Sequence, residues 1–204
     1  MSLILMGTLS SQDEAFNPIP THEFGVNATH LVSNLIPFEG VAAIEPTASL
    51  IFFKRGNGRL YWRNGLNVDA NKLETEFDET KNHLLMLKTG FEIKNSIAKS
   101  WTIHYGSEIL GFWQGSSTKS TDPFFGEFEN KQRTNSYGLN FMYGIQWLIN
   151  ERIALSSEGS FFAAITMDTS ETDSGPGFPV NTIKTNGYGI DFVVPNSIYF
   201  SYYF

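Results

Sequence analysis

Apolar and polar residues alternate with a period of two along several stretches of this chain. The clearest stretch covers residues 137–148, where one face carries Tyr137, Leu139, Phe141, Tyr143, Ile145 and Trp147. A period of two indicates a β-strand whose two faces meet different surroundings. The same alternation predicts strands over residues 22–34, 46–55, 59–75, 82–95, 100–115, 134–149, 152–166 and 192–204.

The connections between these strands are alternately short and long. Those near 56–58, 96–99 and 150–151 are short, whereas those near 35–45, 76–81, 116–133 and 167–191 are longer and mostly polar. The pair Asn57-Gly58 is a strong hairpin signal, and a two-residue turn there places Ile51 and Phe53 on the outward face. This alternation predicts an eight-stranded antiparallel up-and-down β-barrel with both termini at the short-turn end.

One segment departs from the pattern. Residues 186–194 read neither as a clean strand nor as an ordinary loop, and Pro195 follows them. Proline cannot donate a ladder hydrogen bond, so we expect Pro195 at a strand start, an edge or a bulge. A ten-stranded barrel, with two further strands in this region, is the alternative.

The chemistry of the two faces predicts which side of the barrel is apolar. The apolar face has Trp62, Trp101 and Trp147 near strand ends, a distribution typical of an aromatic girdle at a membrane interface. The other face combines glycine and small polar residues with charges of both signs. Small residues inside a narrow barrel leave room for long charged side chains, whereas outside a soluble barrel they would weaken the strands. The sequence therefore favours a transmembrane β-barrel over a soluble ligand-binding barrel such as a lipocalin.

The polar face predicts a network of charges inside the barrel. Its members are Arg63, Lys88, Glu92, His104, Glu108 and Glu158. Centring the hairpin near residue 98 places Lys88 opposite Glu108 and Glu92 opposite His104. Charges away from water are tolerated when they form a connected, hydrogen-bonded set. An eight-stranded barrel has little interior space beyond its side chains, so we interpret the network as a plug, with an ion or proton path as the alternative.

Composition excludes several classes of function. The net charge of −7 provides no basic stripe for nucleic acid, and the absence of cysteine excludes disulfides and thiolate metal sites. No apolar run reaches the roughly 18 residues of a membrane-spanning helix. Residues 1–21 are predicted to be a signal-peptide remnant or a disordered N-terminus, and residues 22–204 to be the barrel domain.

The C-terminal residues carry a family resemblance. Ile198, Phe200, Tyr202 and Phe204 alternate on one apolar face, and the last of them is the final residue of the sequence. This resembles the terminal strand of bacterial outer-membrane proteins, where it is a recognition signal for the barrel-assembly machinery. Together with the girdle and the loop alternation, the chain is similar to small OmpA-type or OmpX-type barrels. The resemblance implies a place in the bacterial outer membrane, in contact with its lipid and lipopolysaccharide.

No catalytic signature stands out, and we expect neither an enzyme nor a cofactor or metal site. Some barrels of this size modify lipid A, which would need a serine, a histidine and an acid on the lipid-facing side. Here His104 is predicted to face the lumen and Ser107 the exterior, so the two would not share a catalytic site. A lipid-modifying enzyme is therefore kept only as the alternative function. His104, Glu92 and Glu108 contain suitable metal ligands, but ion pairing explains them equally well.

The external loops are the predicted carriers of function. Phe124, Phe125 and Phe128 place three aromatic rings in an otherwise polar segment. They are candidate contacts for an external protein or glycan, and folding back over the barrel mouth is the alternative. The function predicted from the sequence is therefore structural or adhesive, with a plugged lumen.

Overall fold

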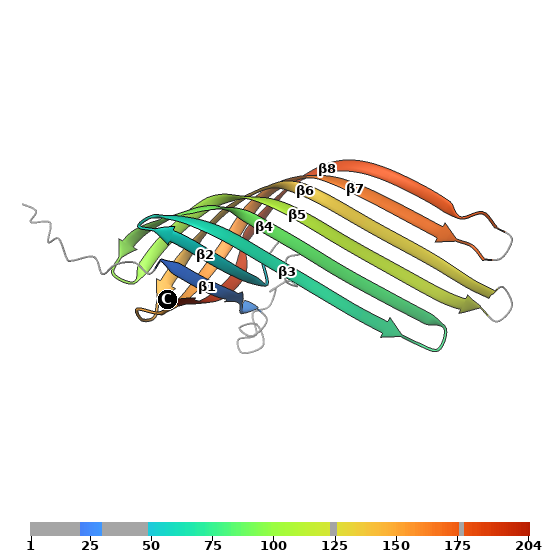
Figure 1. The fold of residues 1–204 in the computed structure, drawn as a ribbon, viewed down its shortest axis with the longest axis horizontal. Coiled ribbons are helices and arrows are strands. Elements are labelled where there is room, and N and C mark those ends of the chain that lie inside the picture. The colour runs from blue at the N-terminus through green and yellow to red at the C-terminus, as the bar shows by residue number, and fades with distance from the viewer. Residues whose placement is uncertain (1–20, 30–48, 123–125, 176–177) are drawn as a thin grey trace, which may run out of the picture.

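The computed structural model describes residues 21–29, 49–122, 126–175 and 178–204, which form eight antiparallel strands (Figure 1). The strands are β1 (His22–Asn27), β2 (Ile51–Asn57), β3 (Leu60–Glu74), β4 (Asp78–Ala98), β5 (Trp101–Asp122), β6 (Gly126–Leu148), β7 (Ile153–Asp173) and β8 (Asn181–Tyr203). Each strand pairs with its neighbours in sequence, and β1 pairs with β8, which closes the sheet into a barrel. The predicted all-β, antiparallel, up-and-down topology is confirmed.

The two ends of the barrel differ. The connections β2–β3, β4–β5 and β6–β7 lie at the end where the described N-terminal residues meet the C-terminus, as the hydrogen bond from the Phe204 amide to the His22 carbonyl shows. This confirms the predicted position of both strand termini. Within the described residues, no helix has the length and apolar character to cross a membrane.

At the opposite end the predicted long loops are mostly wrong. Strand β5 continues to Asp122 and β6 begins at Gly126, so the predicted loop 116–133 is almost entirely a β-hairpin. Likewise β7 runs to Asp173 and β8 starts at Asn181, in place of the loop predicted over 167–191. The segment 76–81 is reduced to a connection over residues 75–77. Most residues of these stretches are polar whichever face they occupy, so the stretches lack the clear alternation that predicts a strand.

We call the part of β3–β8 beyond the apolar belt the extension. In Figure 1 it projects to the right, past the short strands β1 and β2. Among the described residues, β3 beyond Leu66 pairs only with β4, and β8 before Ser197 pairs only with β7. Within the described residues, the extension is therefore a curved sheet of six strands.

Strand β8 also accounts for the irregular segment before Pro195. Residues 186–194, the candidate for an extra strand pair, belong to β8. Between Glu158 and Ser160 of β7, the partner on β8 changes from Ser197 to Val193, so β8 has two additional residues there. Pro195 falls within this bulge, as predicted, because a bulged residue needs no ladder hydrogen bond.

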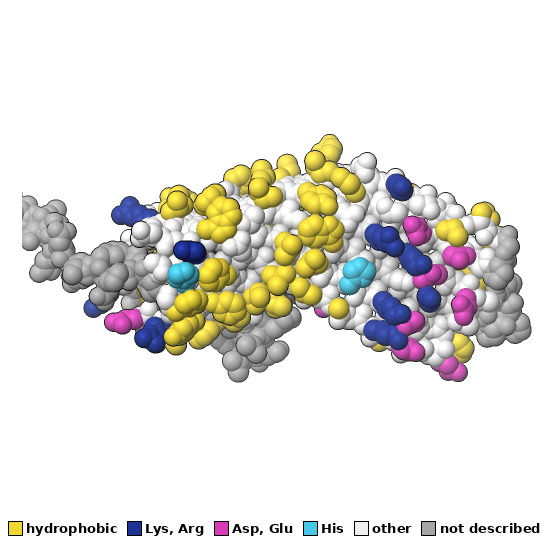
Figure 2. Space-filling model, viewed as in Figure 1, with side chains coloured by type: hydrophobic (Ala, Val, Ile, Leu, Met, Phe, Trp, Pro, Cys, Tyr) yellow, Lys and Arg dark blue, Asp and Glu magenta, His cyan; other side chains and the backbone are white. Residues whose placement is uncertain are grey.

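The apolar and charged side chains are arranged in the opposite way from those of a soluble protein. Large apolar residues cover the outside of the barrel around its middle, as Figure 2 shows for one face. Leu139 and Phe141, for example, remain about half exposed, at 50% and 48%. The inside holds charged groups together with aromatic rings such as Phe52, Tyr61 and Tyr199. The predicted faces of the strands are thus confirmed.

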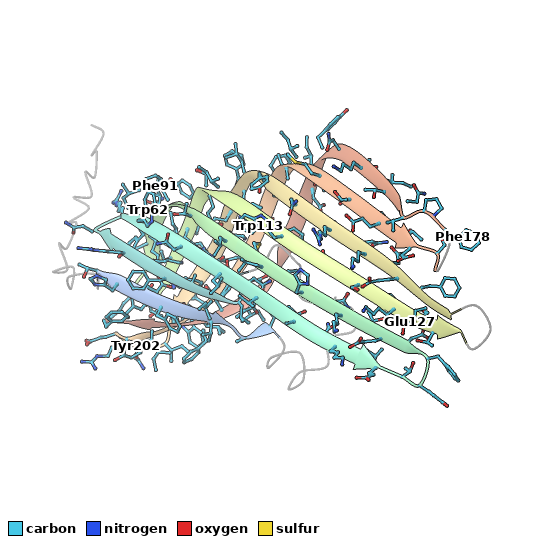
Figure 3. All side chains as sticks on the ribbon, turned by 45° about the vertical axis from the view of Figure 1, so that its right-hand side comes forward. Trp62, Phe91, Trp113, Glu127, Phe178 and Tyr202 are labelled. Atoms are coloured by element: carbon cyan, nitrogen blue, oxygen red, sulfur yellow. The ribbon has the colours of Figure 1, made fainter. Side chains whose placement is uncertain are left out.

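The predicted girdle residues lie outside, at the short-turn end. Trp62, Trp101 and Trp147 are exposed, and the last two stack with ring centroids 6.0 Å apart. Figure 3 shows Trp62 and Tyr202 at this end, and Glu127 and Phe178 at the far end of the extension. Phe200, Tyr202 and Phe204 also face outward, which matches their predicted shared face. Their role as an assembly signal remains a prediction.

A second aromatic pair, not predicted, borders the belt on the extension side. The Trp113 indole nitrogen donates to the Tyr137 hydroxyl over 3.2 Å, and the two rings make an edge contact. Trp101 and Trp113 are twelve positions apart along β5. At a rise of about 3.4 Å per residue and a tilt of about 45°, the two girdles are roughly 29 Å apart along the barrel axis.

The β2–β3 turn forms one residue later than predicted. Asn57 pairs with Leu60, so the two turn residues are Gly58 and Arg59. Gly58 has a φ of +65°, which suits the first central position of a type II′ turn. The predicted outward positions of Ile51 and Phe53 hold, because their neighbours Phe52 and Lys54 are buried.

We expect Gly58→Ala to lower the free energy of unfolding by about 1–2 kcal/mol, since a Cβ is strained at positive φ. Gly187→Ala is the matched control, because a Cβ there meets no atom within 4 Å and its φ is not positive. Urea unfolding of the refolded variants, followed by tryptophan fluorescence, measures both. Equal losses for the two variants would contradict the assigned turn.

Candidate functional site

The interior of the barrel is filled by one cluster of charged side chains. All six predicted network residues, Arg63, Lys88, Glu92, His104, Glu108 and Glu158, are buried, with exposed fractions of 7% or less. The structure adds three members that the sequence pattern did not predict, namely Glu23, Lys54 and Lys94. We call these nine residues the lumen cluster. They come from six strands, so only barrel closure brings them together.

Arg63 is the centre of the lumen cluster. Its Nη2 lies 2.7 Å from Glu158 Oε2, its Nη1 3.2 Å from Glu92 Oε2 and its Nε 3.1 Å from Glu108 Oε1. Three carboxylates on three other strands therefore share one guanidinium. Arginine suits this position because its planar group presents five donors in fixed directions.

The two additional lysines complete the pairing at the short-turn end. Lys54 Nζ lies 2.8 Å from Glu92 Oε2, and Lys94 Nζ donates to Glu23 and, over 2.8 Å, to the Tyr203 hydroxyl. The Gln146 amide also donates to Glu23 over 3.0 Å. These contacts tie β8 and β1 to the middle of the barrel.

The charges of the lumen cluster balance. Four cations, Lys54, Arg63, Lys88 and Lys94, face four carboxylates, Glu23, Glu92, Glu108 and Glu158. Balance matters because an isolated charge away from water costs several kcal/mol, whereas a fully paired set is tolerated. Aromatic rings fill the space between the charges, and the Arg63 guanidinium carbon lies 4.7 Å from the centre of the Phe52 ring. The interior is thus filled by paired charges and aromatic side chains.

The predicted cross-strand register of β4 and β5 is wrong by two residues. Glu108 pairs with Gly90 and His104 with Lys94, instead of Lys88 and Glu92. A bulge between Ser96 and Ala98 shifts the hairpin, and bulges leave no trace in an alternating pattern. A shift of two keeps every side chain on its face, so the lumen residues were still identified correctly. Lys88 and Glu108 remain within 3.8 Å of each other, diagonally.

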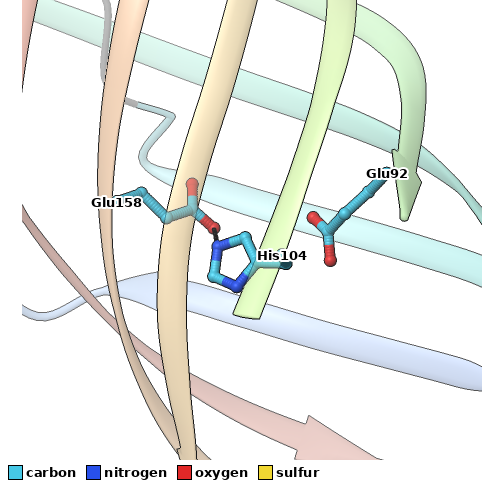
Figure 4. A group of neighbouring side chains, drawn as sticks. All are labelled: Glu92, His104 and Glu158. Carbon is cyan, nitrogen blue, oxygen red and sulfur yellow. Dashed lines mark ion pairs between the residues drawn. The ribbon is translucent and has the colours of Figure 1, made fainter. Parts of the chain in front are cut away.

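His104 lies against Glu158, with 3.3 Å between Nε2 and the carboxylate oxygen (Figure 4). The imidazole occupies space next to Gly144, where a Cβ would collide with the ring. Glu92, His104 and Glu158 offer ligand atoms within 4.8 Å of one another, a spacing that suits a metal ion. However, the two carboxylates already bind Lys54 and Arg63, and a dication there would lie beside both cations. We therefore assign these three residues to the ion-pair network.

The remaining residues singled out in the sequence are spread over the molecule. Ser107 lies on the outer face, on the opposite side of β5 from His104. Phe124 and Phe125 lie outside the described residues, as do residues 1–20 of the predicted signal remnant over residues 1–21. Phe128 is half-buried on β6, on the same face as the lumen residues of that strand. Two exposed rings that the sequence pattern did not single out, Phe77 and Phe178, lie in the connections at the far end of the extension.

Comparisons of the chain with protein-family models, curated proteins and solved structures found no match. A barrel fold alone does not specify a function, because one fold hosts many activities. The function of this chain is therefore inferred from its own geometry and chemistry.

We expect Arg63→Met to lower the free energy of unfolding by about 3–5 kcal/mol, because three buried carboxylates lose their shared cation. Urea unfolding in vesicles measures the loss. The control is Arg59→Met, which removes an exposed cation at the β2–β3 turn and should change stability by less than about 0.5 kcal/mol. Adding Glu158→Gln to Arg63→Met should restore part of the loss, and equal midpoints for all variants would contradict the central role of Arg63.

The extension has its own, exposed charge network, which responds to acid. Hydrogen bonds from Lys72 and Lys81 lower the pKa of Glu79 to about 2, from an ordinary value of 4.5. The Lys131 ammonium lowers the pKa of Glu129 in the same way. A depressed carboxyl pKa stabilises the folded form above the ordinary value, and the stabilisation is lost as the pH falls through the folded value.

We therefore expect acidification from pH 4.5 to pH 2 to loosen the extension before the barrel. Amide hydrogen exchange should accelerate around residues 72–81 while the amides near Trp62 and Phe91 stay protected. Glu79→Gln removes the titrating group, so its extension should show a weaker pH dependence in this range. Uniform acceleration along the whole of β3 and β4 would contradict the expectation.

Proposed function

We propose that this protein is an integral β-barrel of the bacterial outer membrane, with a plugged lumen and a structural or surface-interaction role. The observation that carries the proposal is the inverted arrangement of side chains. A belt of half-exposed apolar residues surrounds a lumen whose charges are buried and paired. In water this arrangement would expose the apolar belt to solvent, whereas in a bilayer the same belt lies against hydrocarbon.

The dimensions of the belt support the membrane placement. The girdles at Trp101 and Trp113 are roughly 29 Å apart along the axis, and the hydrocarbon core of a bilayer is about 30 Å thick. A soluble ligand-binding barrel needs the opposite orientation, with apolar residues lining a cavity. Here the inward positions are held by groups such as Arg63 and Glu92.

The lumen cluster supports a role other than that of an open channel. An eight-stranded barrel has an interior just wide enough for side chains, and here those side chains are joined across it by ion pairs. A passage for ions or solutes would require several of these pairs to break together. The energetic cost of exposing a buried ion pair therefore favours a closed lumen.

The extension supports a surface-interaction role. It projects about 20 Å beyond the belt, estimated from nine positions between Trp113 and Asp122 on a tilted strand. Phe77 and Phe178 are exposed in the connections at its far end, at 54% and 68%. Exposed aromatic rings held away from the bilayer on paired strands suit contact with a partner outside the cell.

Heat-modifiable migration in detergent tests the barrel proposal, because a folded membrane barrel and its boiled form run differently on a gel. We expect two bands for the refolded chain, and co-flotation of the folded form with phospholipid vesicles. Leu139→Lys, at the middle of the belt, should reduce stability in vesicles by about 2–4 kcal/mol. Lys119→Leu, in the extension, is the control and should change it little.

The same preparation tests the closed lumen in planar bilayers, where no large steady current is expected. A single band before and after boiling, with the protein soluble without detergent, would contradict the membrane placement. Large steady currents from a well-folded sample would contradict only the plug.

A further inference from the structure

The outward-facing charges of the extension are ordered by sign. On five of the six long strands, the first outward charged or titratable side chain met beyond the apolar belt is basic. These residues are Lys72 on β3, His83 on β4, Lys119 on β5, Arg133 on β6 and Lys184 on β8. Strand β7 is the exception and begins with an acid, Glu171. Figure 2 shows charged side chains of both signs beyond the apolar belt on one face, with acidic residues among the basic ones and farther out.

The register of the sheet aligns part of this pattern into a row. His83 pairs with Gly115, Gly115 with Arg133, Arg133 with Thr169 and Thr169 with Lys184. The three basic residues therefore lie on alternate strands, about 10 Å apart, since neighbouring strands are about 4.8 Å apart. The His83 ring lies over Gly115, and the small residue Thr169 lies between Arg133 and Lys184. We call His83, Arg133 and Lys184 the basic row.

Arg133 and Lys184 of the basic row are free to bind an anion. Farther out, Lys72, Lys81 and Lys131 pair with Glu74, Glu79 and Glu129 at 2.7–3.0 Å. By contrast, Arg133 and Lys184 are exposed and form no ion pair with any residue that the structure describes. Arg133 and Lys184 are thus left for a ligand, whereas acids neutralise Lys72, Lys81 and Lys131.

Arg133 of the basic row lies close to the depth of lipid headgroups. On β6, Arg133 is four positions beyond the girdle residue Tyr137, which is about 14 Å along the strand and about 10 Å along the axis. The polar headgroup region extends about 5–8 Å beyond the hydrocarbon on each side of a bilayer. An arginine side chain reaching back toward the belt therefore covers this region.

We propose that the basic row binds the phosphate groups of lipid headgroups in the leaflet that surrounds the extension. This inference rests on the proposed membrane placement. Guanidinium and ammonium groups donate several charge-assisted hydrogen bonds to phosphate, and arginine does so with two parallel bonds. Beyond the row, Glu129 is already paired with Lys131, so the unpaired cations of the row are the ones available to phosphate.

The four tryptophans provide a test with an internal reference. A chain retaining only Trp113, with Trp62, Trp101 and Trp147 changed to phenylalanine, reports on lipid next to the basic row. It is reconstituted in phosphatidylcholine vesicles containing a small fraction of brominated phosphatidic acid, and in parallel with the same fraction of brominated phosphatidylcholine. The bromine quenches the fluorescence of a neighbouring tryptophan. A chain retaining only Trp101 reports on the other interface.

We expect the phosphatidic acid to quench Trp113 about threefold more than phosphatidylcholine does at equal fraction. In R133Q/K184Q the two lipids should quench about equally, while R59Q/K99Q, which removes two cations at the short-turn end, should keep the excess. In the unaltered four-tryptophan chain the same difference should appear with smaller amplitude, so the test survives if the single-tryptophan chain does not fold.

The outcomes separate this proposal from the one it rests on. Equal quenching by both lipids in the Trp113 chain, or an excess that persists in R133Q/K184Q, would overturn the basic row as a phosphate site and leave the membrane placement intact. No quenching of Trp113 or Trp101 by either lipid would overturn the membrane placement, and the phosphate site with it.

Discussion

The cost of an unpaired charge in a narrow, water-poor interior governs this structure. Arg63 satisfies three carboxylates at once, and each of them comes from a different strand. The pairs can form only when the sheet closes, so electrostatics and topology depend on each other. Because removing one partner leaves the others uncompensated, the lumen cluster acts as a unit. Hydrophobic burial contributes less to the interior here than in a soluble protein, since the large apolar side chains face outward.

The belt region of the fold was predictable from the sequence because its two faces differ. Where apolar and polar residues alternate, as in 137–148, the strand and its orientation follow directly, and six lumen residues were identified in this way. The extension was not predictable, because Ser116 to Gln132 is polar on both faces and such a segment reads as a loop. The unpredicted lumen residues lie on the inward face of their strands. Glu23 and Lys94 lie toward strand ends and Lys54 lies in the short strand β2, where the pattern gives no sign of burial.

Register was the other limit of prediction from the sequence. The bulge at Ser96–Ala98 displaces the β4–β5 pairing by two residues, and the turn after β2 forms at Gly58–Arg59 rather than at Asn57-Gly58. Both differences depend on local backbone geometry, which the pattern of apolar and polar residues does not reveal. The predicted inward or outward direction of the side chains remained correct despite these errors, because a displacement by an even number of residues preserves the direction of every side chain.

The incomplete pairing of the extension has a mechanical consequence. In the closed part of the barrel every described strand has neighbours on both sides, and bending one strand strains the whole circumference. Beyond Leu66 of β3 and before Ser197 of β8 that circumference is interrupted within the described residues. Where the described sheet is open, it can twist and flatten about its own axis, as open sheets do. A force applied at the outer tips is thus taken up first by the open part of the described sheet.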